Sequence, residues 1–173
     1  MRLLLSFISI LLLSSCSGMK PTDFKDQKPR LIIEDYLSGN VKAWGILQNR
    51  SGKVTRQFSA SLNGKWDGAQ LILDEKFNWS DGEIQKRQWK IKKIDEHNYI
   101  GTAPDVVGEA KGFSYGSAFK FEYDLMISIK GKNIKISFDD WIFKQDDKVA
   151  INRATLSKFG FKVGELTVFF RKN

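Results

Sequence analysis

The chain has few of the residue types on which metal chemistry and cross-linking depend. Its 173 residues include one cysteine, one histidine and three prolines. A lone cysteine excludes an intramolecular disulfide, and with one histidine the nitrogen and sulfur ligands of a zinc or haem site are missing. We therefore expect no metal and no other cofactor. The length suits one ordinary domain, and 42% hydrophobic residues are typical of a globular core rather than a disordered chain.

Long apolar runs are also scarce, and the clearest one, residues 3–13, opens the chain behind Met1-Arg2. It is shorter than the roughly 20 residues that span a bilayer, but it fits the apolar part of a signal peptide. The tetrapeptide Leu13-Ser14-Ser15-Cys16 that follows resembles a bacterial lipobox. That resemblance implies that residues 1–15 are removed as a lipoprotein signal peptide and that Cys16 becomes the acylated first residue. The alternative is an ordinary secretory signal with a chance cysteine.

The residue after the cysteine bears on the location. In Gram-negative lipoproteins an aspartate there usually retains the protein at the inner membrane, and Ser17 is not one. We therefore expect a lipid anchor at Cys16 in the outer membrane, on its periplasmic face. Residues 16–29 are polar and contain Pro21 and Pro29, so we expect a lipidated tether ahead of one barrel domain, residues 30–173.

Basic residues outnumber acidic ones by 28 to 20, which gives a formal net charge of +8. Such an excess usually points to an anionic partner. The lysines and arginines are spread along the chain instead of forming a basic arm or recognition helix, so we expect no nucleic acid partner. The excess is interpreted as a solvated surface with a mild attraction to anionic lipid head groups.

The apolar pattern predicts a short helix and then only strands. Residues 30–37 have helical spacing, whereas after Gly39 apolar and polar residues alternate between turn sequences. No helix long enough for a parallel crossover lies between the strands, so the sheet must be antiparallel. We predict an all-β, lipocalin-like (calycin-type) antiparallel barrel of about 8–10 strands, because closure removes the exposed edges. The strands are predicted at residues 41–48, 54–62, 69–79, 83–94, 99–103, 117–129, 134–143, 149–156 and 166–171.

Hairpin geometry predicts which residues face each other. A three-residue loop at residues 80–82 sets Glu75 opposite Arg87 and Leu73 opposite Trp89, whereas a two-residue loop would set apolar residues against lysines. The three-residue loop is therefore preferred.

A second carboxylate is predicted to face an arginine in the same way. A four-residue loop at residues 130–133 would pair Tyr123 with Asp140, and the next turn would place Asp140 opposite Arg153. Because a buried lone charge is costly, each carboxylate needs its partner. One interpretation is a structural girdle of ion pairs that determines register.

The other interpretation is a ligand site inside the barrel, since small-molecule sites combine apolar walls with a few polar groups. An arginine that its carboxylate does not fully neutralise suits an anionic head group. We therefore predict binding or shuttling of a fatty acid or similar amphiphile. Its chain would contact Phe77, Trp79, Trp89, Phe121, Leu125 and Phe138, and its polar end would meet Arg87, Arg153 and Tyr123 beside Glu75 and Asp140.

Two patterns are compatible with an enzyme. Residues 112–116 match the G-x-S-x-G of hydrolase elbows, but the histidine, His97, precedes Ser114 and no helix is predicted after the serine. Alternatively, Glu75 and Asp140 could act as an acid–base pair on an acyl or isoprenoid substrate, although arginine partners are expected to lower both pKa values. A third class is a scaffold of an envelope complex, which predicts a filled barrel and a large apolar surface patch.

The least regular stretch, residues 101–116, contains four glycines around Pro104. Glycines of this kind permit tight corners or bulges. The stretch is interpreted either as a barrel corner or as a lid or portal loop.

Several short motifs together resemble an uncharacterised family of bacterial lipoproteins, domain of unknown function 3833. The similarity covers nearly the whole mature chain, although an asparagine is expected where Ser117 stands. It implies an envelope lipoprotein without an established activity, from a family often encoded near fatty-acyl-modifying enzymes. The motifs are Asp105-Val106-Val107-Gly108-Glu109-Ala110, Gly116-Ser117-Ala118, Asp139-Asp140-Trp141, Asn152-Arg153-Ala154 and Lys158-Phe159-Gly160.

Overall fold

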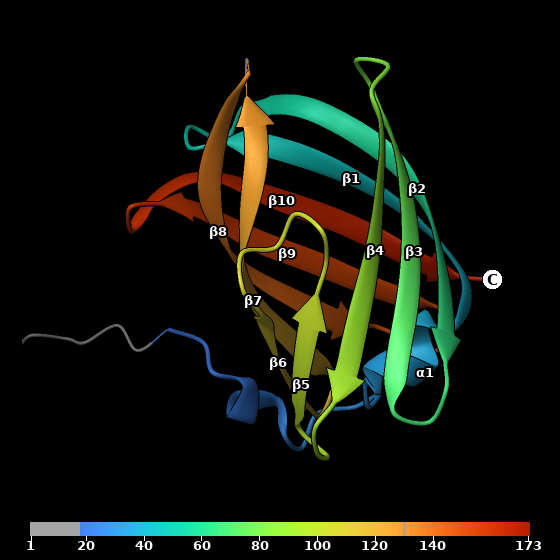
Figure 1. Ribbon diagram of the computed structural model, residues 1–173. Coiled ribbons are helices and arrows are strands. Elements are labelled where there is room, and N and C mark those ends of the chain that lie inside the picture. The colour runs from blue at the N-terminus through green and yellow to red at the C-terminus, as the bar shows by residue number, and fades with distance from the viewer. Residues whose placement is uncertain (1–17, 130) are drawn as a thin grey trace, which may run out of the picture.

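Ten antiparallel strands close into a barrel in the computed structural model, which describes residues 18–129 and 131–173 (Figure 1). Each strand pairs with the next in the chain, and β1 closes the barrel on β10. The predicted antiparallel barrel is thus confirmed, while the predicted signal peptide and Cys16 lie outside the described residues. The strands are β1 (Gly39–Asn49), β2 (Val54–Trp66), β3 (Gln70–Trp79), β4 (Ile84–Lys93), β5 (Asn98–Thr102), β6 (Ala110–Tyr115), β7 (Ala118–Ile129), β8 (Lys132–Lys144), β9 (Val149–Lys158) and β10 (Phe161–Lys172).

The strand missing from the sequence prediction is β6, which lies within the glycine-rich stretch. A Cβ atom on Gly112 would stand 2.8 Å from the Phe119 ring and 2.9 Å from Cβ of Tyr99. Glycine at this position therefore makes room for two aromatic side chains inside a strand. The stretch is thus irregular at residues 103–109, as predicted, and forms a regular strand at residues 110–115.

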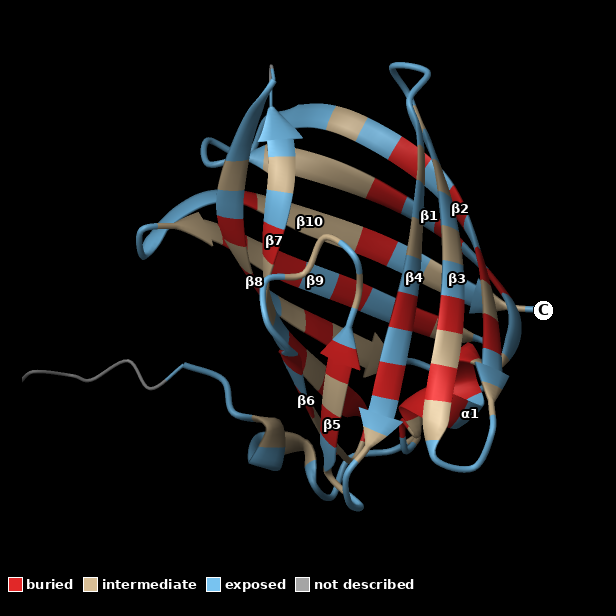
Figure 2. Ribbon diagram, in the orientation of Figure 1, coloured by how far each residue is buried: buried red, intermediate tan, exposed pale blue. Residues whose placement is uncertain are grey.

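A short helix closes one end of the barrel. Buried and exposed residues alternate along the strands, and the predicted helix is present as α1 (Ile33–Leu37) at the lower end in Figure 2. Leu31 and Ile33 are fully buried there. Within residues 18–129 and 131–173, no helix has the length and apolar character needed to cross a membrane.

The described part of the predicted tether lies against the barrel from Pro21 onward. A 3-10 helix, η1 (Pro21–Phe24), places the Phe24 ring 5.8 Å from Trp141 and 5.4 Å from Phe143, measured between ring centroids. The side chains of Trp141 and Phe143 point away from the barrel interior, so this segment covers an apolar patch on the outer face.

Three registers were predicted, and their outcomes differ. Between β3 and β4, Glu75 lies opposite Arg87 and Leu73 opposite Trp89, as the three-residue loop predicts. Between β7 and β8 the prediction was wrong by two residues, because both strands run further and pair Ile129 with Lys132. A shift of two residues preserves the faces, so Asp140 still points inward.

The register between β8 and β9 was wrong by one residue, which has a larger effect. Asp140 lies opposite Ala154, and Arg153 lies opposite Trp141. The connecting loop is one residue longer than predicted, and a one-residue slip turns every side chain to the other face. Arg153 therefore points outward, where its Nη2 donates to Glu165 at 2.8 Å.

The loop between β5 and β6, residues 103–109, crosses a gap in the barrel wall, and we call it the strap. β4 pairs with β5 from Lys90 to Lys93, so the first half of β4 extends beyond that pairing. The strap fills part of this space: the Val107 amide donates to the Asp124 carbonyl at 2.9 Å, and the Met126 amide donates to the Asp105 carbonyl at 2.8 Å. In Figure 1 it is the yellow loop between β4 and β7.

Candidate functional site: an interior cavity with buried carboxyl groups

A cavity of about 100 Å³ lies inside the barrel. Its wall is largely apolar and combines aliphatic with aromatic side chains. Among the aromatic ones, the ring centroids of Trp89, Phe121 and Tyr123 are 5.1–5.4 Å apart. A small polar region interrupts this wall. Its members come from five strands and are Glu75, Arg87, Tyr123, Asp140 and Asn152.

The structure brings most of the predicted site residues to this cavity. Those that line it are Glu75, Phe77, Arg87, Trp89, Phe121, Tyr123 and Asp140. Leu125 and Phe138 instead belong to a second apolar cluster near the β7–β8 turn. Trp79 packs against Phe58 with ring centroids 4.8 Å apart, at the end of β3.

Arg87 is held by the strap instead of by the carboxylate that faces it in the sheet. Its Nε and Nη2 donate to the Asp105 carboxylate at 2.7–3.1 Å, while Nη1 lies 3.9 Å from Oε2 of Glu75. The guanidinium is therefore neutralised from outside the sheet. The expectation of an incompletely neutralised arginine was wrong in this respect.

Glu75 has a buried carboxyl oxygen, Oε2, that forms no hydrogen bond. Burial raises the pKa of Glu75 to about 7, because the loss of hydration outweighs the favourable effects of Arg87 and the Trp89 indole, and Asp140 and Asp105 add repulsion. The sequence predicted a lowered pKa from the arginine. That prediction was wrong because burial raises the pKa of Glu75 more than Arg87 lowers it.

Asp140 is the second buried carboxyl group. The Tyr123 hydroxyl donates to its Oδ2 at 3.0 Å, and Nδ2 of Asn152 donates to its Oδ1. Burial raises the pKa of Asp140 to about 6, although both hydrogen bonds act to lower it. Asn152 is thus the polar partner of Asp140 in place of the predicted Arg153, and the predicted lowering of the pKa was again wrong.

Two polar residues of the site were missed by the sequence prediction, as were several apolar residues of the cavity wall. Asn152 precedes Arg153, so a hairpin loop one residue longer would have placed it inside. Asp105 stands in a segment without alternation, and no local rule indicates which way its side chain points. Its membership in the first of the family-like motifs was the available signal.

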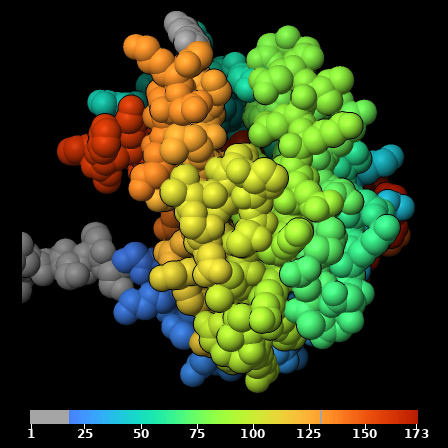
Figure 3. All heavy atoms as spheres, viewed as in Figure 1, coloured from blue at the N-terminus to red at the C-terminus, as the bar shows by residue number. Residues whose placement is uncertain are grey.

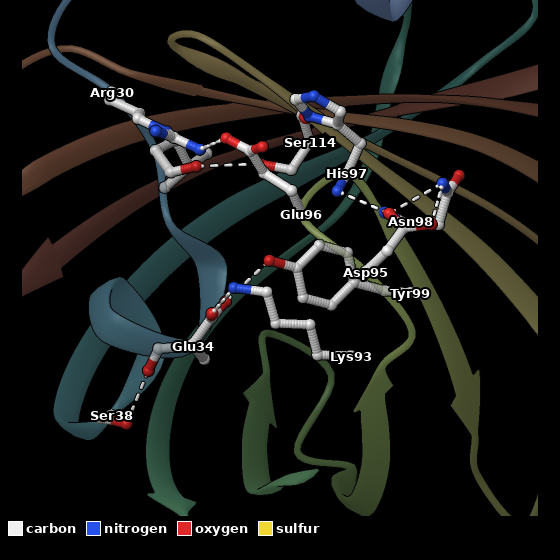
Figure 4. A network of polar contacts seen from close by, with 11 residues as sticks. Arg30, Glu34, Ser38, Lys93, Asp95, Glu96, His97, Asn98, Tyr99 and Ser114 are labelled. Carbon is white, nitrogen blue, oxygen red and sulfur yellow. Dashed lines mark hydrogen bonds and ion pairs between the residues drawn. The ribbon is translucent and has the colours of Figure 1, made fainter. Parts of the chain in front are cut away.

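The serine of the hydrolase-like pattern has a structural role. The Ser114 hydroxyl donates to the Leu31 carbonyl at 3.0 Å, and Nδ1 of His97 lies 2.8 Å from the Ser114 carbonyl oxygen (Figure 4). The histidine therefore contacts the backbone of Ser114 rather than its hydroxyl group. These contacts hold the chain ahead of α1 against β6.

A second polar group in Figure 4 stabilises the closed end of the barrel. Glu34 of α1 is 5% exposed and accepts hydrogen bonds from Lys93 at 2.5 Å and from the Tyr99 hydroxyl at 2.9 Å. Its partners belong to β4 and β5, so the cluster ties the helix to the barrel. Among the described residues, no group of three or more histidine, cysteine, aspartate or glutamate side chains is arranged to hold a metal ion.

The fold and the cavity define a lipocalin-like barrel, an architecture in which strands enclose a small interior space. By sequence, the chain belongs to the family of proteins of unknown function DUF3833, whose model matches residues 10–172. This confirms the family resemblance found in the motifs. No curated protein matches the sequence.

Two solved structures have a similar fold at low sequence identity. A protein of unknown function from the DUF3598 family of Nostoc punctiforme has a TM-score of 0.63 and 13% identity over 85% of this chain and 51% of that protein. This chain thus spans about half of that protein's length. The S-type phycobiliprotein lyase of Guillardia theta has a TM-score of 0.57 and 6% identity over 81% of this chain and 90% of the lyase. Both similarities concern the fold alone.

Proposed function

We propose that this protein is an outer-membrane lipoprotein, anchored in the periplasm through acylated Cys16, that binds a small amphiphile inside its barrel. The observation that carries the binding proposal is the buried Oε2 atom of Glu75, which lies in the cavity wall without a hydrogen bond. Leaving such an atom unsatisfied costs about 1–3 kcal/mol. A ligand with a polar group at this point would remove that cost.

The size of the cavity limits what enters the barrel in this conformation. Small-molecule pockets usually measure about 300–1,000 Å³. The present cavity, at about 100 Å³, has the volume of about three water molecules in the liquid. The polar end of an amphiphile and a short part of its chain fit, and a longer chain requires the wall to open.

The strap is the part of the wall that we expect to open. It crosses the gap between β4 and β7, and Figure 3 shows its yellow atoms below a hollow between the green and orange atoms. Asp105 connects it to Arg87, and residues 106–107 connect it to β7. Release of the Arg87–Asp105 pair would widen the opening and give an amphiphile a lateral route to the cavity.

The charges around the cavity restrict the head group. Three carboxyl groups, on Glu75, Asp105 and Asp140, surround one guanidinium, which Asp105 already neutralises. A neutral or cationic head group therefore meets less repulsion than a carboxylate. A fatty acid, the ligand predicted from the sequence, would enter in its protonated form.

A competition experiment tests the binding proposal. A fluorescent amphiphile bound to delipidated protein is displaced with dodecylamine, dodecanol and dodecanoic acid, which share one chain length. We expect displacement in that order of affinity at pH 7.5, and at least tenfold weaker binding in Glu75→Gln for the amine. Asp74→Asn, an exposed neighbour on the outer face, is the matched control. If none of the three compounds competes and native mass spectrometry finds no co-purified lipid, the proposal is wrong.

One observation favours an enzyme as a second candidate. Burial gives both Glu75 and Asp140 pKa values near neutrality, about 7 and about 6, which suits an acid–base pair. An enzyme acting on an acyl or isoprenoid substrate would lose turnover in Asp140→Asn while still binding the amphiphile. A binding protein would yield no product in either form.

A further inference from the structure

Exposed apolar side chains are concentrated at the end of the barrel opposite α1. Thirteen large hydrophobic residues are exposed in the described part of the chain, and eight of them stand at or near turns of that end. All five connections at this end carry at least one. The residues are Val54, Ile84, Val107, Met126, Ile129, Phe159, Phe161 and Val163.

The turn between β9 and β10 is the extreme case. Phe159 is 88% exposed and Phe161 is 76% exposed. Residues 158–162, which we call the tip, form a two-residue turn in which Lys158 pairs with Phe161. Two aromatic rings of one hairpin tip are thus largely exposed to water.

The backbone conformation of the turn makes a phenylalanine at residue 159 energetically unfavourable. Phe159 has φ = 52° and Gly160 has φ = 80°. Two-residue turns with positive φ at both positions prefer Asn-Gly, because asparagine tolerates this conformation better than a large side chain does. Phe159 therefore stands where an asparagine would cause less backbone strain. Because its ring is exposed, the side chain adds no burial energy that would offset this strain.

The charges beside the rings are mostly positive. The Lys158 ammonium lies 5.2 Å from the Phe159 ring centroid. Lys162 and Arg153 share one carboxylate, Glu165, at 3.0 and 2.8 Å. Two cations thus share one carboxylate near the tip, and a third cation lies against the Phe159 ring. Aromatic rings flanked by lysines are typical of segments that lie in the interface of an anionic bilayer.

We propose that the tip enters the surface of an anionic lipid bilayer, with Phe159 and Phe161 at the acyl boundary and Lys158 and Lys162 at the lipid phosphates. The location of the tip supports this orientation. In Figure 1 the tip projects on the left side of the barrel, where the first described residues also leave it. The lipid anchor proposed at Cys16 lies ahead of these residues in the chain, so this part of the argument rests on the proposed function. The inference does not depend on a ligand in the cavity.

A site-specific fluorescent label tests the proposal in the full acylated protein. The sequence has one cysteine, Cys16, which acylation would block, so Phe159→Cys provides a single reactive thiol for an environment-sensitive dye. With vesicles of phosphatidylglycerol and phosphatidylethanolamine, we expect a blue-shifted emission that spin-labelled lipids quench. The same dye at Ala69→Cys, in a turn at the α1 end, is the control and should keep its aqueous emission.

A second variant separates insertion from folding. Phe159→Asn gives the turn its preferred residue, so the barrel should be at least as stable as before. A dye at Phe161→Cys in this background should lose about half or more of its quenching compared with the Phe161→Cys protein alone. Unchanged aqueous emission at residue 159 in vesicle-bound protein, or equal quenching at residues 159 and 69, would overturn the proposal. Displacement of the amphiphile probe, measured separately, reports on the cavity.

Discussion

Arg87 forms its short contacts with Asp105 of the strap, 2.7–3.1 Å from Nε and Nη2, and lies 3.9 Å from Glu75, its partner across the sheet. Asp105, which lies in a loop outside the sheet, thus forms the ion pair with Arg87 that strand alternation predicted for Glu75. The consequence is a glutamate that stays buried with one oxygen free of hydrogen bonds. Both the attachment of the strap to β4 and the polar region of the cavity depend on this one pairing.

Removal of the Asp105 carboxylate should loosen the attachment of the strap to the barrel. In Asp105→Asn we expect Arg87 to turn toward Glu75, which lowers the pKa of Glu75, and we expect the free energy of unfolding to fall by about 1–3 kcal/mol. Hydrogen exchange should accelerate at the amides of Val107 and Met126, which bond across the strap. Asp74→Asn controls for loss of a carboxylate. Unaltered exchange in the strap would contradict the gating role of the pair.

The raised pKa of Glu75 predicts a pH dependence of stability. Its folded value of about 7 exceeds its ordinary value of 4.5, so the folded state binds more protons between these pH values. The contribution of Glu75 is therefore fully present below pH 4.5 and is lost as the pH rises through 7. Compared with the wild type, Glu75→Gln should be near neutral at pH 4.5 and more stable by about 2–3 kcal/mol at pH 8.

Urea unfolding of both proteins at the two pH values measures this difference. The comparison isolates Glu75, because Asp140, with a pKa of about 6, titrates in both proteins. Equal differences in unfolding free energy at pH 4.5 and pH 8 would show that the carboxyl group is not buried as described.

The register between β8 and β9 predicts losses of stability of different size at two adjacent residues. Asn152→Ala removes a buried amide that donates to Asp140 and to the Trp141 carbonyl, so we expect a loss of about 2–4 kcal/mol. Arg153→Ala removes an exposed ion pair with Glu165, so we expect less than about 1 kcal/mol. Chemical denaturation checks both values, and the reverse order would support the register predicted from the sequence.

The proposed anchor predicts two effects on localisation. Cys16→Ser should abolish metabolic labelling with a fatty-acid analogue and release the protein from the membrane fraction. Ser17→Asp should keep the label but shift the protein from the outer to the inner membrane. Labelling that persists in Cys16→Ser would refute acylation at this residue.

Local pattern was sufficient for the barrel and for seven of the residues that line its cavity. The period-two alternation from Gly39 onward indicated the strands and their inward faces, since each residue's face depends only on its neighbours. The Ser80-Asp81-Gly82 turn then paired Glu75 with Arg87 correctly, because a glycine with positive φ determines the loop length.

The length of the β8–β9 loop explains why Arg153 was wrongly predicted to point into the barrel. The turn of residues 145–149 has no glycine to determine its length, and one extra residue exchanged Arg153 for Asn152 inside the barrel. The strap lacks alternation altogether, so the position of Asp105 follows from contacts between segments that are distant in sequence.

The sequence by itself determined that this chain forms an antiparallel barrel with carboxyl groups on its inner face, because alternation and turn chemistry are local properties. Only the tertiary structure decided which cation meets which carboxylate and that both interior acids have raised pKa values. Those outcomes depend on burial and on distances between remote segments, and these exist only once the barrel has closed.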